Sequence, residues 1–274
     1  MGNNILSQYA DYKAYNNTCR SKSIITHNLD NDDVETLDRL NSDNFFISKK
    51  GSDKKLIDLH LSLIFNQILA SWENPTPSIA RAIIPGYTVH KGLVPRNLVY
   101  VGDIKKESLA GIRNFLIESG LKDVIESRYQ CPAGVCNVRA YAFSHDPDNK
   151  NTHHNEKFDN HSVNKIGQHK DVLPPETLKI MVFKNRDGSK LDEASGGLQL
   201  LSDKSWITIS GQSPCVIFNS CALEHRSQIT KPGNIRDAIE ITIIPFHNDS
   251  FPIVSAGGAA GCPLNPASGW DNLP

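Results

Sequence analysis

The chain has 274 residues, enough for one large domain or two small ones, and 39% of them are apolar, enough for a buried core. Its 29 Lys and Arg residues nearly balance its 30 Asp and Glu residues, and a net charge of −1 excludes strong attraction to nucleic acid or an anionic membrane. No apolar run approaches the roughly 18 residues of a membrane-spanning helix, and the polar start MGNNILSQYADY lacks the layout of a signal peptide. We therefore expect a cytoplasmic protein whose partners are small molecules.

The first part of the chain predicts helices. A weak helical pattern covers residues 32–41, and a stronger one covers 53–72, where Asp53 is suited to the N-cap position. A third covers 105–121, with Gly120 placed to end it in a left-handed conformation. We expect segment 1–97 to pack as helical and irregular structure on the outside of the core.

The second part predicts strands. Short β-branched and aromatic runs occur at 97–104, 122–130, 136–144, 178–183, 197–202, 205–210, 215–220 and 238–246. Helices followed by a series of strands indicate an α+β protein with a β-sandwich or barrel, which we place at residues 98–246. The polar insert 145–165 is expected to be a loop beside the site, and 247–274 an irregular tail that Trp270 anchors.

One pattern indicates a metal site. His169 and Asp171 are two positions apart, so in an extended segment both side chains point to the same side. His225, just after the predicted strand 215–220, can complete two-histidine, one-carboxylate coordination, which suits a ferrous ion with open positions. His154 and Glu156 form a competing pair, but they lie in the polar insert without flanking strands.

A second pattern indicates an anion site. Arg236 opens the apolar run AIEITII, and an arginine that points into an apolar interior implies an anion there, which Ser227 could help to bind. Arg139, in the alternating run NVRAYAF, either faces the same interior or is a surface arginine, and Lys179 has the same ambiguity.

Together these residues resemble a known family. QHKD at 168–171, with GGLQLL, SWITISGQSPCVIF and HRSQITKPGNIRDAIEI, is similar to the His-x-Asp…His-x-Ser…Arg pattern of the iron(II)/2-oxoglutarate-dependent oxygenases. The spacing from Ser227 to Arg236 is closest to the phytanoyl-CoA dioxygenase-like branch, and the resemblance covers about residues 98–246.

The resemblance implies a double-stranded β-helix, the jelly-roll or cupin-like fold, with the N-terminal helices packed outside. It implies that His169, Asp171 and His225 hold Fe(II), and that Arg236 and Ser227 bind the distal carboxylate of 2-oxoglutarate. If Arg139 faces the interior, we expect it to contact the keto acid or an anionic substrate; the alternative is a surface arginine. Dioxygen would then oxidise a small molecule while 2-oxoglutarate becomes succinate. Halogenases of the family have a small residue at the position of Asp171, so a carboxylate there favours hydroxylation, desaturation or another oxidation.

Two other functions fit the same residues. One is a non-catalytic cupin-like protein that binds a metal or a small anion as a sensor, although such a protein has no need of the Ser227 and Arg236 pair. The other is a hydroxylase of protein side chains, with a groove in place of a closed pocket.

Overall fold

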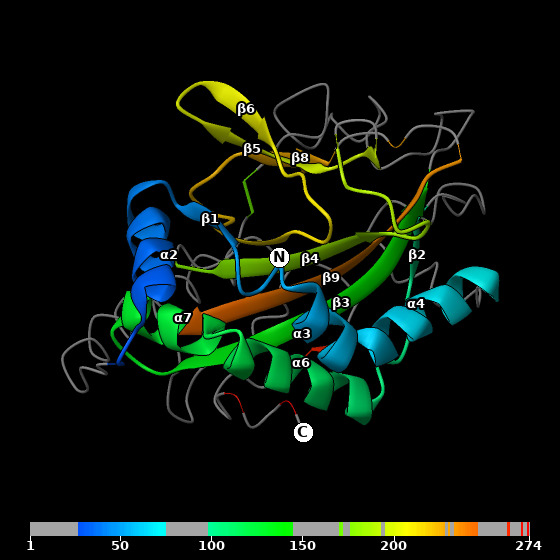
Figure 1. Ribbon diagram of the computed structural model, residues 1–274, viewed down its shortest axis with the longest axis horizontal. Coiled ribbons are helices and arrows are strands. Elements are labelled where there is room, and N and C mark those ends of the chain that lie inside the picture. Colours follow the sequence, from blue (N-terminus) through cyan, green and yellow to red (C-terminus); the bar gives the residue numbers. More distant parts are fainter. Residues whose placement is uncertain are drawn as a thin grey trace, which may run out of the picture.

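The structure is a computed structural model in which two antiparallel β-sheets face each other and helices cover the outer side of the larger sheet (Figure 1). It describes residues 27–74, 98–144, 170–171, 176–192, 195–227, 230, 233–245, 262–263, 270 and 273. Within these ranges, no helix combines the length and the apolar character that spanning a membrane requires.

The sheets form a two-layer core. The strands of the larger sheet are β1 (Phe45–Ser48), β2 (Leu98–Tyr100), β3 (Ala133–Ser144), β4 (Leu178–Asn185), β7 (Cys215–Asn219), β9 (Ile235–Pro245) and β10 (Cys262–Pro263). Their order is β1-β7-β4-β9-β3-β10, and β2 also pairs with β3. The strands of the smaller sheet are β5 (Leu198–Ser202), β6 (Ser205–Thr208) and β8 (His225–Ser227), in the order β6-β5-β8.

The helices precede most of the strands in the chain. They are α2 (Asn31–Ser42), α3 (Lys54–His60), α4 (Ser62–Glu73), α6 (Lys106–Glu118) and α7 (Leu121–Tyr129). Figure 1 shows α3, α4, α6 and α7 on the side of the larger sheet that faces away from β5, β6 and β8. The α+β class and the outer position of the helices agree with the sequence prediction.

Alternation along the strands separates two apolar clusters. On β9, Ile239, Ile241 and Ile243 pack under the helices, whereas Ala238 joins the cluster between the sheets. On β3, Tyr141 and Phe143 belong to the inner cluster. The even-numbered residues of β9, the odd-numbered residues of β4 and, after the irregularity between Val135 and Asn137, the odd-numbered residues of β3 therefore face the interior between the two sheets.

Four local predictions need correction. The helix predicted over 53–72 is two helices, α3 and α4, which part at Leu61, although Asp53 caps α3 as expected by accepting a hydrogen bond from the Lys55 N–H. The strand predicted at 122–130 is wrong, since these residues lie largely in α7. The tail 247–274 was expected to be irregular, but Cys262–Pro263 forms strand β10, which pairs with β3. Strand β1 was not predicted.

Candidate metal and anion site

Asp171 and His225 meet at the inner side of the fold. Oδ1 of Asp171 lies 3.8 Å from Nε2 of His225, and both side chains are largely buried. The imidazole packs edge-on against Phe218 of the inner cluster, with the ring centroids 5.2 Å apart. The two predicted ligands that the structure describes are therefore brought together.

Local hydrogen bonds explain this meeting. The N–H of Asp171 donates to the carbonyl of Ser220, just beyond the end of β7. There the side-chain oxygen of Asn219 accepts hydrogen bonds from the N–H groups of Cys221 and Ala222, which forms the tight turn that leads into β8. His225 opens β8, opposite Leu200 of β5. The turn after β7 therefore positions both residues.

Metal binding through Nε2 needs the His225 tautomer that carries its proton on Nδ1. Nδ1 lies 3.2 Å from the carbonyl oxygen of Leu223, which would accept a hydrogen bond from that proton. The other nitrogen, Nε2, then presents its lone pair toward Asp171. Two atoms bonded to one transition-metal ion at about 2.1 Å are at most about 4.2 Å apart, so the observed 3.8 Å suits shared coordination.

Arg236 lies deeper in the interior. It is 1% exposed, and its guanidinium lies 5.2 Å from the ring centre of Phe143 and 5.3 Å from that of Phe183. Within the described part of the chain, Nε and Nη1 have no hydrogen-bond partner. Burial lowers the pKa of Arg236, which Tyr141 opposes.

An unpaired buried guanidinium is costly, because it has lost its water without gaining an acceptor. Its planar donors match the two oxygens of a carboxylate. The donors at Arg236 therefore fit the distal carboxylate of 2-oxoglutarate, and Asp171 with His225 fits a divalent metal.

A chain of alternating charges lies beside the metal-binding pair. Arg139 Nη2 is 2.5 Å from Glu240 Oε1, which is 3.1 Å from the ammonium nitrogen of Lys179. That ammonium lies 2.6 Å from Oδ2 of Asp171. The structure thus resolves the ambiguity of Arg139 and Lys179, since both face the interior.

Glu240 was missed in the sequence. The signal was present, because it is a carboxylate within the mostly apolar run AIEITIIP, where the strand is buried on both faces. Burial acts to raise the pKa of Glu240, but Arg139 and Lys179 outweigh it and hold that pKa below its usual value.

Part of the predicted site lies outside the described residues. His169, the competing pair His154 and Glu156, and the insert 145–165 are among these. The backbone of Ser227 pairs with Leu198 in the smaller sheet, but its side chain is not described. The roles of His169 and Ser227 stay predictions.

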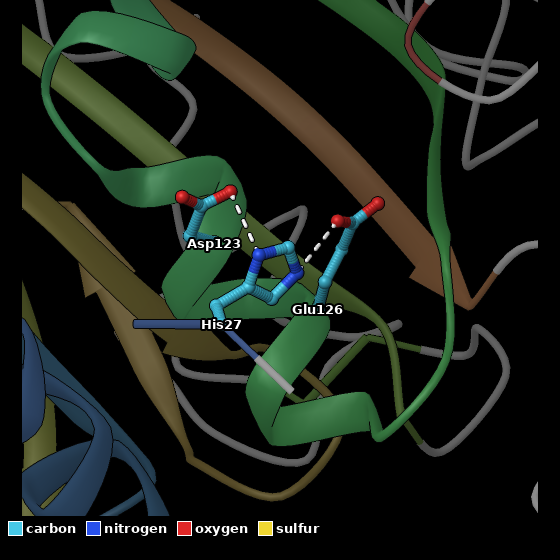
Figure 2. A group of neighbouring side chains, drawn as sticks. All are labelled: His27, Asp123 and Glu126. Carbon is cyan, nitrogen blue, oxygen red and sulfur yellow. Dashed lines mark ion pairs between the residues drawn. The ribbon is translucent and has the colours of Figure 1, made fainter. Parts of the chain in front are cut away.

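A second group of metal-binding residue types consists of His27 with Asp123 and Glu126 of α7 (Figure 2). Nδ1 of His27 is 3.3 Å from Asp123 Oδ1, and Nε2 is 3.0 Å from Glu126 Oε2. The ammonium of Lys122 already lies 2.9 Å from the same oxygen of Glu126. The indole N–H of Trp270 donates to Oε1 of Glu126, at 2.8 Å.

In this cluster each imidazole nitrogen faces its own carboxylate, and a metal would have to displace the Lys122 ammonium. We therefore interpret it as an ion cluster that fastens His27 and Trp270 to α7. Trp270 is buried against the helix-side core, which agrees with the prediction that this residue docks on the fold.

No protein-family model and no curated protein sequence matches this chain. Solved structures do. The non-heme alpha ketoglutarate dependent epimerase SnoN from nogalamycin biosynthesis is 10% identical, with a TM-score of 0.53 over 86% of this chain and 93% of that one. EctD from S. alaskensis, with 2-oxoglutarate and 5-hydroxyectoine, is 11% identical, with a TM-score of 0.53 over 90% of each chain. AviO1 from Streptomyces viridochromogenes Tue57 is 13% identical, with a TM-score of 0.50 over 83% of this chain and 99% of that one.

At such identities the similarity concerns the fold. The chain shares the jelly-roll fold of SnoN and EctD, so the fold that the sequence resemblance predicted is confirmed. The phytanoyl-CoA dioxygenase-like branch stays a prediction.

Proposed function

We propose that this protein is a non-haem Fe(II)- and 2-oxoglutarate-dependent dioxygenase that hydroxylates a small molecule. His169, Asp171 and His225 would hold the metal. Arg236 and Ser227 would bind the distal carboxylate of 2-oxoglutarate, and residues 98–246 would form the catalytic core between segment 1–97 and the tail 247–274.

The observation that carries this proposal is the buried guanidinium of Arg236, whose Nε and Nη1 have no hydrogen-bond partner among the described residues, in a fold that also brings Asp171 and His225 together. Arg236 and Glu240 face the same interior and are four residues apart on β9, about 13 Å along an extended strand. The Lys179 side chain contacts both Glu240 and Asp171, so Asp171 lies near the Glu240 end of this separation of about 13 Å. An arginine side chain and a five-carbon diacid together can span about this distance.

When bound, Fe(II) supplies the redox chemistry by which dioxygen oxidises the substrate while 2-oxoglutarate is converted to succinate. The side chains of the protein bind the metal and the 2-oxoglutarate and orient them. His225 presents the lone pair of Nε2, Asp171 presents a carboxylate oxygen, and Arg236 fixes the far end of the diacid. Phe143 and Phe183 keep water from the guanidinium, which strengthens its hold on an anion.

Arg139 would contribute to the same site, either toward the keto acid or toward an anionic substrate. Its Nε has no hydrogen-bond partner among the described residues, although Nη2 is engaged by Glu240. The carboxylate of Asp171 favours oxygen transfer over halogenation. Segment 1–97 and the insert 145–165 would shape the substrate pocket.

The first test is anaerobic addition of Fe(II) and 2-oxoglutarate to the metal-free protein. We expect a weak visible charge-transfer band that needs both additions. Lack of this band in the wild type would count against the proposal. A metabolite library, screened for stimulated succinate release, then identifies the substrate class.

The contact between Lys179 and Asp171 favours one alternative, a protein that binds a metal or anion without turnover, because the ammonium occupies one oxygen of the proposed ligand. A sensor of this kind would give the charge-transfer band but no succinate with any substrate. Succinate release therefore separates the two functions.

A further inference from the structure

Lys179 is a buried cation next to a proposed metal ligand. It lies on β4 and is 6% exposed. Burial alone would lower the pKa of Lys179, but the carboxylates of Glu240 and Asp171 outweigh burial and raise it. Its Nζ lies 2.6 Å from Asp171 and 3.1 Å from Glu240, and its position between two carboxylates beside a metal site needs an explanation.

The two oxygens of Asp171 have different neighbours. Oδ2 lies 2.6 Å from the Lys179 ammonium, and Oδ1 lies 3.8 Å from Nε2 of His225. The Lys179 side chain thus contacts Oδ2, whereas Oδ1 faces the histidine.

The ammonium is itself held in place. Glu240 lies 3.1 Å from it and is bound by Arg139, which stands directly opposite Glu240 in the ladder between β3 and β9. The three anchoring residues come from adjacent strands of one sheet. Their charges and that of Asp171 sum to zero, so the four side chains together exert little net repulsion on a cation nearby.

We propose that Lys179 is a positioning residue that holds Oδ2 of Asp171, so that the carboxylate offers Oδ1 alone to the metal. This inference rests on the proposed function. Partners that orient metal ligands typically contribute about 10-fold to 100-fold to metal affinity.

The test measures Co(II) binding to metal-free protein by calorimetry, without 2-oxoglutarate or oxygen. Lys179→Met is expected to lower Co(II) affinity by about 10-fold to 100-fold. It should also change the visible Co(II) spectrum, because a carboxylate released from Lys179 can turn both oxygens to the ion. Lys179→Gln, whose amide can still donate a hydrogen bond, should retain more affinity than Lys179→Met.

Lys184→Met is the matched control. Lys184 lies on the same strand, but its ammonium packs over Phe65 on the helix side, 5.5 Å from the ring centre, so Co(II) affinity should stay unchanged. Thermal melting of each variant establishes that it is folded, and Lys179→Gln provides the test if Lys179→Met does not fold.

The outcomes are distinct. If the Lys179 variants bind Co(II) as tightly as the wild type, or more tightly, the positioning role is overturned, and the ammonium only opposes the cation. If the wild type binds no Co(II), the proposed function is overturned together with this inference.

Discussion

Oδ1 of Asp171 and Nε2 of His225 lie 3.8 Å apart, although they belong to distant segments of the chain. A backbone hydrogen bond from Asp171 to Ser220 holds the first segment against the turn that presents the second. The backbone therefore supports the approach of the two side chains.

Asp171→Ala removes the only negatively charged ligand that we assign to the metal. Loss of a direct ligand costs more than loss of its partners, so Co(II) or Fe(II) affinity should fall by more than about 100-fold and turnover should cease. Calorimetry measures the first and succinate release the second. Asp58→Ala, on the exposed side of α3, is the control and should leave both unchanged. Full activity of Asp171→Ala would remove this residue from the metal site.

Arg236→Met tests the anion site separately from the metal. Truncating one member of a buried charged pair costs about 2–5 kcal/mol, so 2-oxoglutarate should bind at least about 30-fold more weakly while Co(II) affinity is kept. The ligand-free variant should melt no lower than the wild type, because methionine replaces a buried cation whose Nε and Nη1 have no hydrogen-bond partner in the described part of the chain.

Arg39→Met is the control, since Arg39 is exposed on α2 and pairs with Asp43. Calorimetric titration with 2-oxoglutarate in the presence of Co(II) compares the three proteins. Equal affinity of Arg236→Met and the wild type would show that the carboxylate binds elsewhere.

Residue types and spacing predicted an α+β protein with a β-sandwich or barrel, the convergence of Asp171 with His225 and the inward orientation of Arg236. The jelly roll itself was predicted from the resemblance to a family. Strand alternation also allowed Arg139 to face the interior, as it does. Each of these depends on local periodicity or on a motif, which a sequence displays directly.

The charge chain could not be predicted in the same way. Glu240 pairs with Arg139 because β3 and β9 are neighbours in a particular register, and no local pattern specifies that register. The error at α7 has a different cause. Val124 and Ile125 are adjacent β-branched residues typical of a strand, but Leu121, Val124, Ile125 and Tyr129 form one buried helix face.

Gly111 shows how closely the helices pack. A Cβ at this position would lie 2.2 Å from the carbonyl oxygen of His60, at the point where α3 ends and α4 is about to begin. Gly111→Ala should therefore destabilise the fold by about 1–3 kcal/mol, although alanine is the better helix former. Denaturant unfolding measures the change. Glu107→Ala, on the exposed side of α6, should change stability by less than about 0.5 kcal/mol. A more stable Gly111→Ala variant would show that α6 can move away from His60.

We predict that the cluster of His27, Asp123 and Glu126 stabilises the fold and does not bind a metal. Glu126 is buried, contacts His27 and Lys122, and accepts hydrogen bonds from the indole of Trp270 and the N–H of Ala133. Glu126→Ala leaves these groups without their carboxylate and should cost roughly 3 kcal/mol of unfolding free energy. Glu73→Ala, at the exposed end of α4, is the control for stability.

His27→Ala separates this cluster from the metal site. If the metal is bound at Asp171 and His225, the variant should keep the Co(II) affinity and stoichiometry of the wild type, with only a lower melting temperature. Calorimetry with Co(II) and with Zn(II) measures both quantities. Loss of one bound ion in His27→Ala would instead make His27, Asp123 and Glu126 a metal site, because an ion cluster closed by the Lys122 ammonium has no ion to lose.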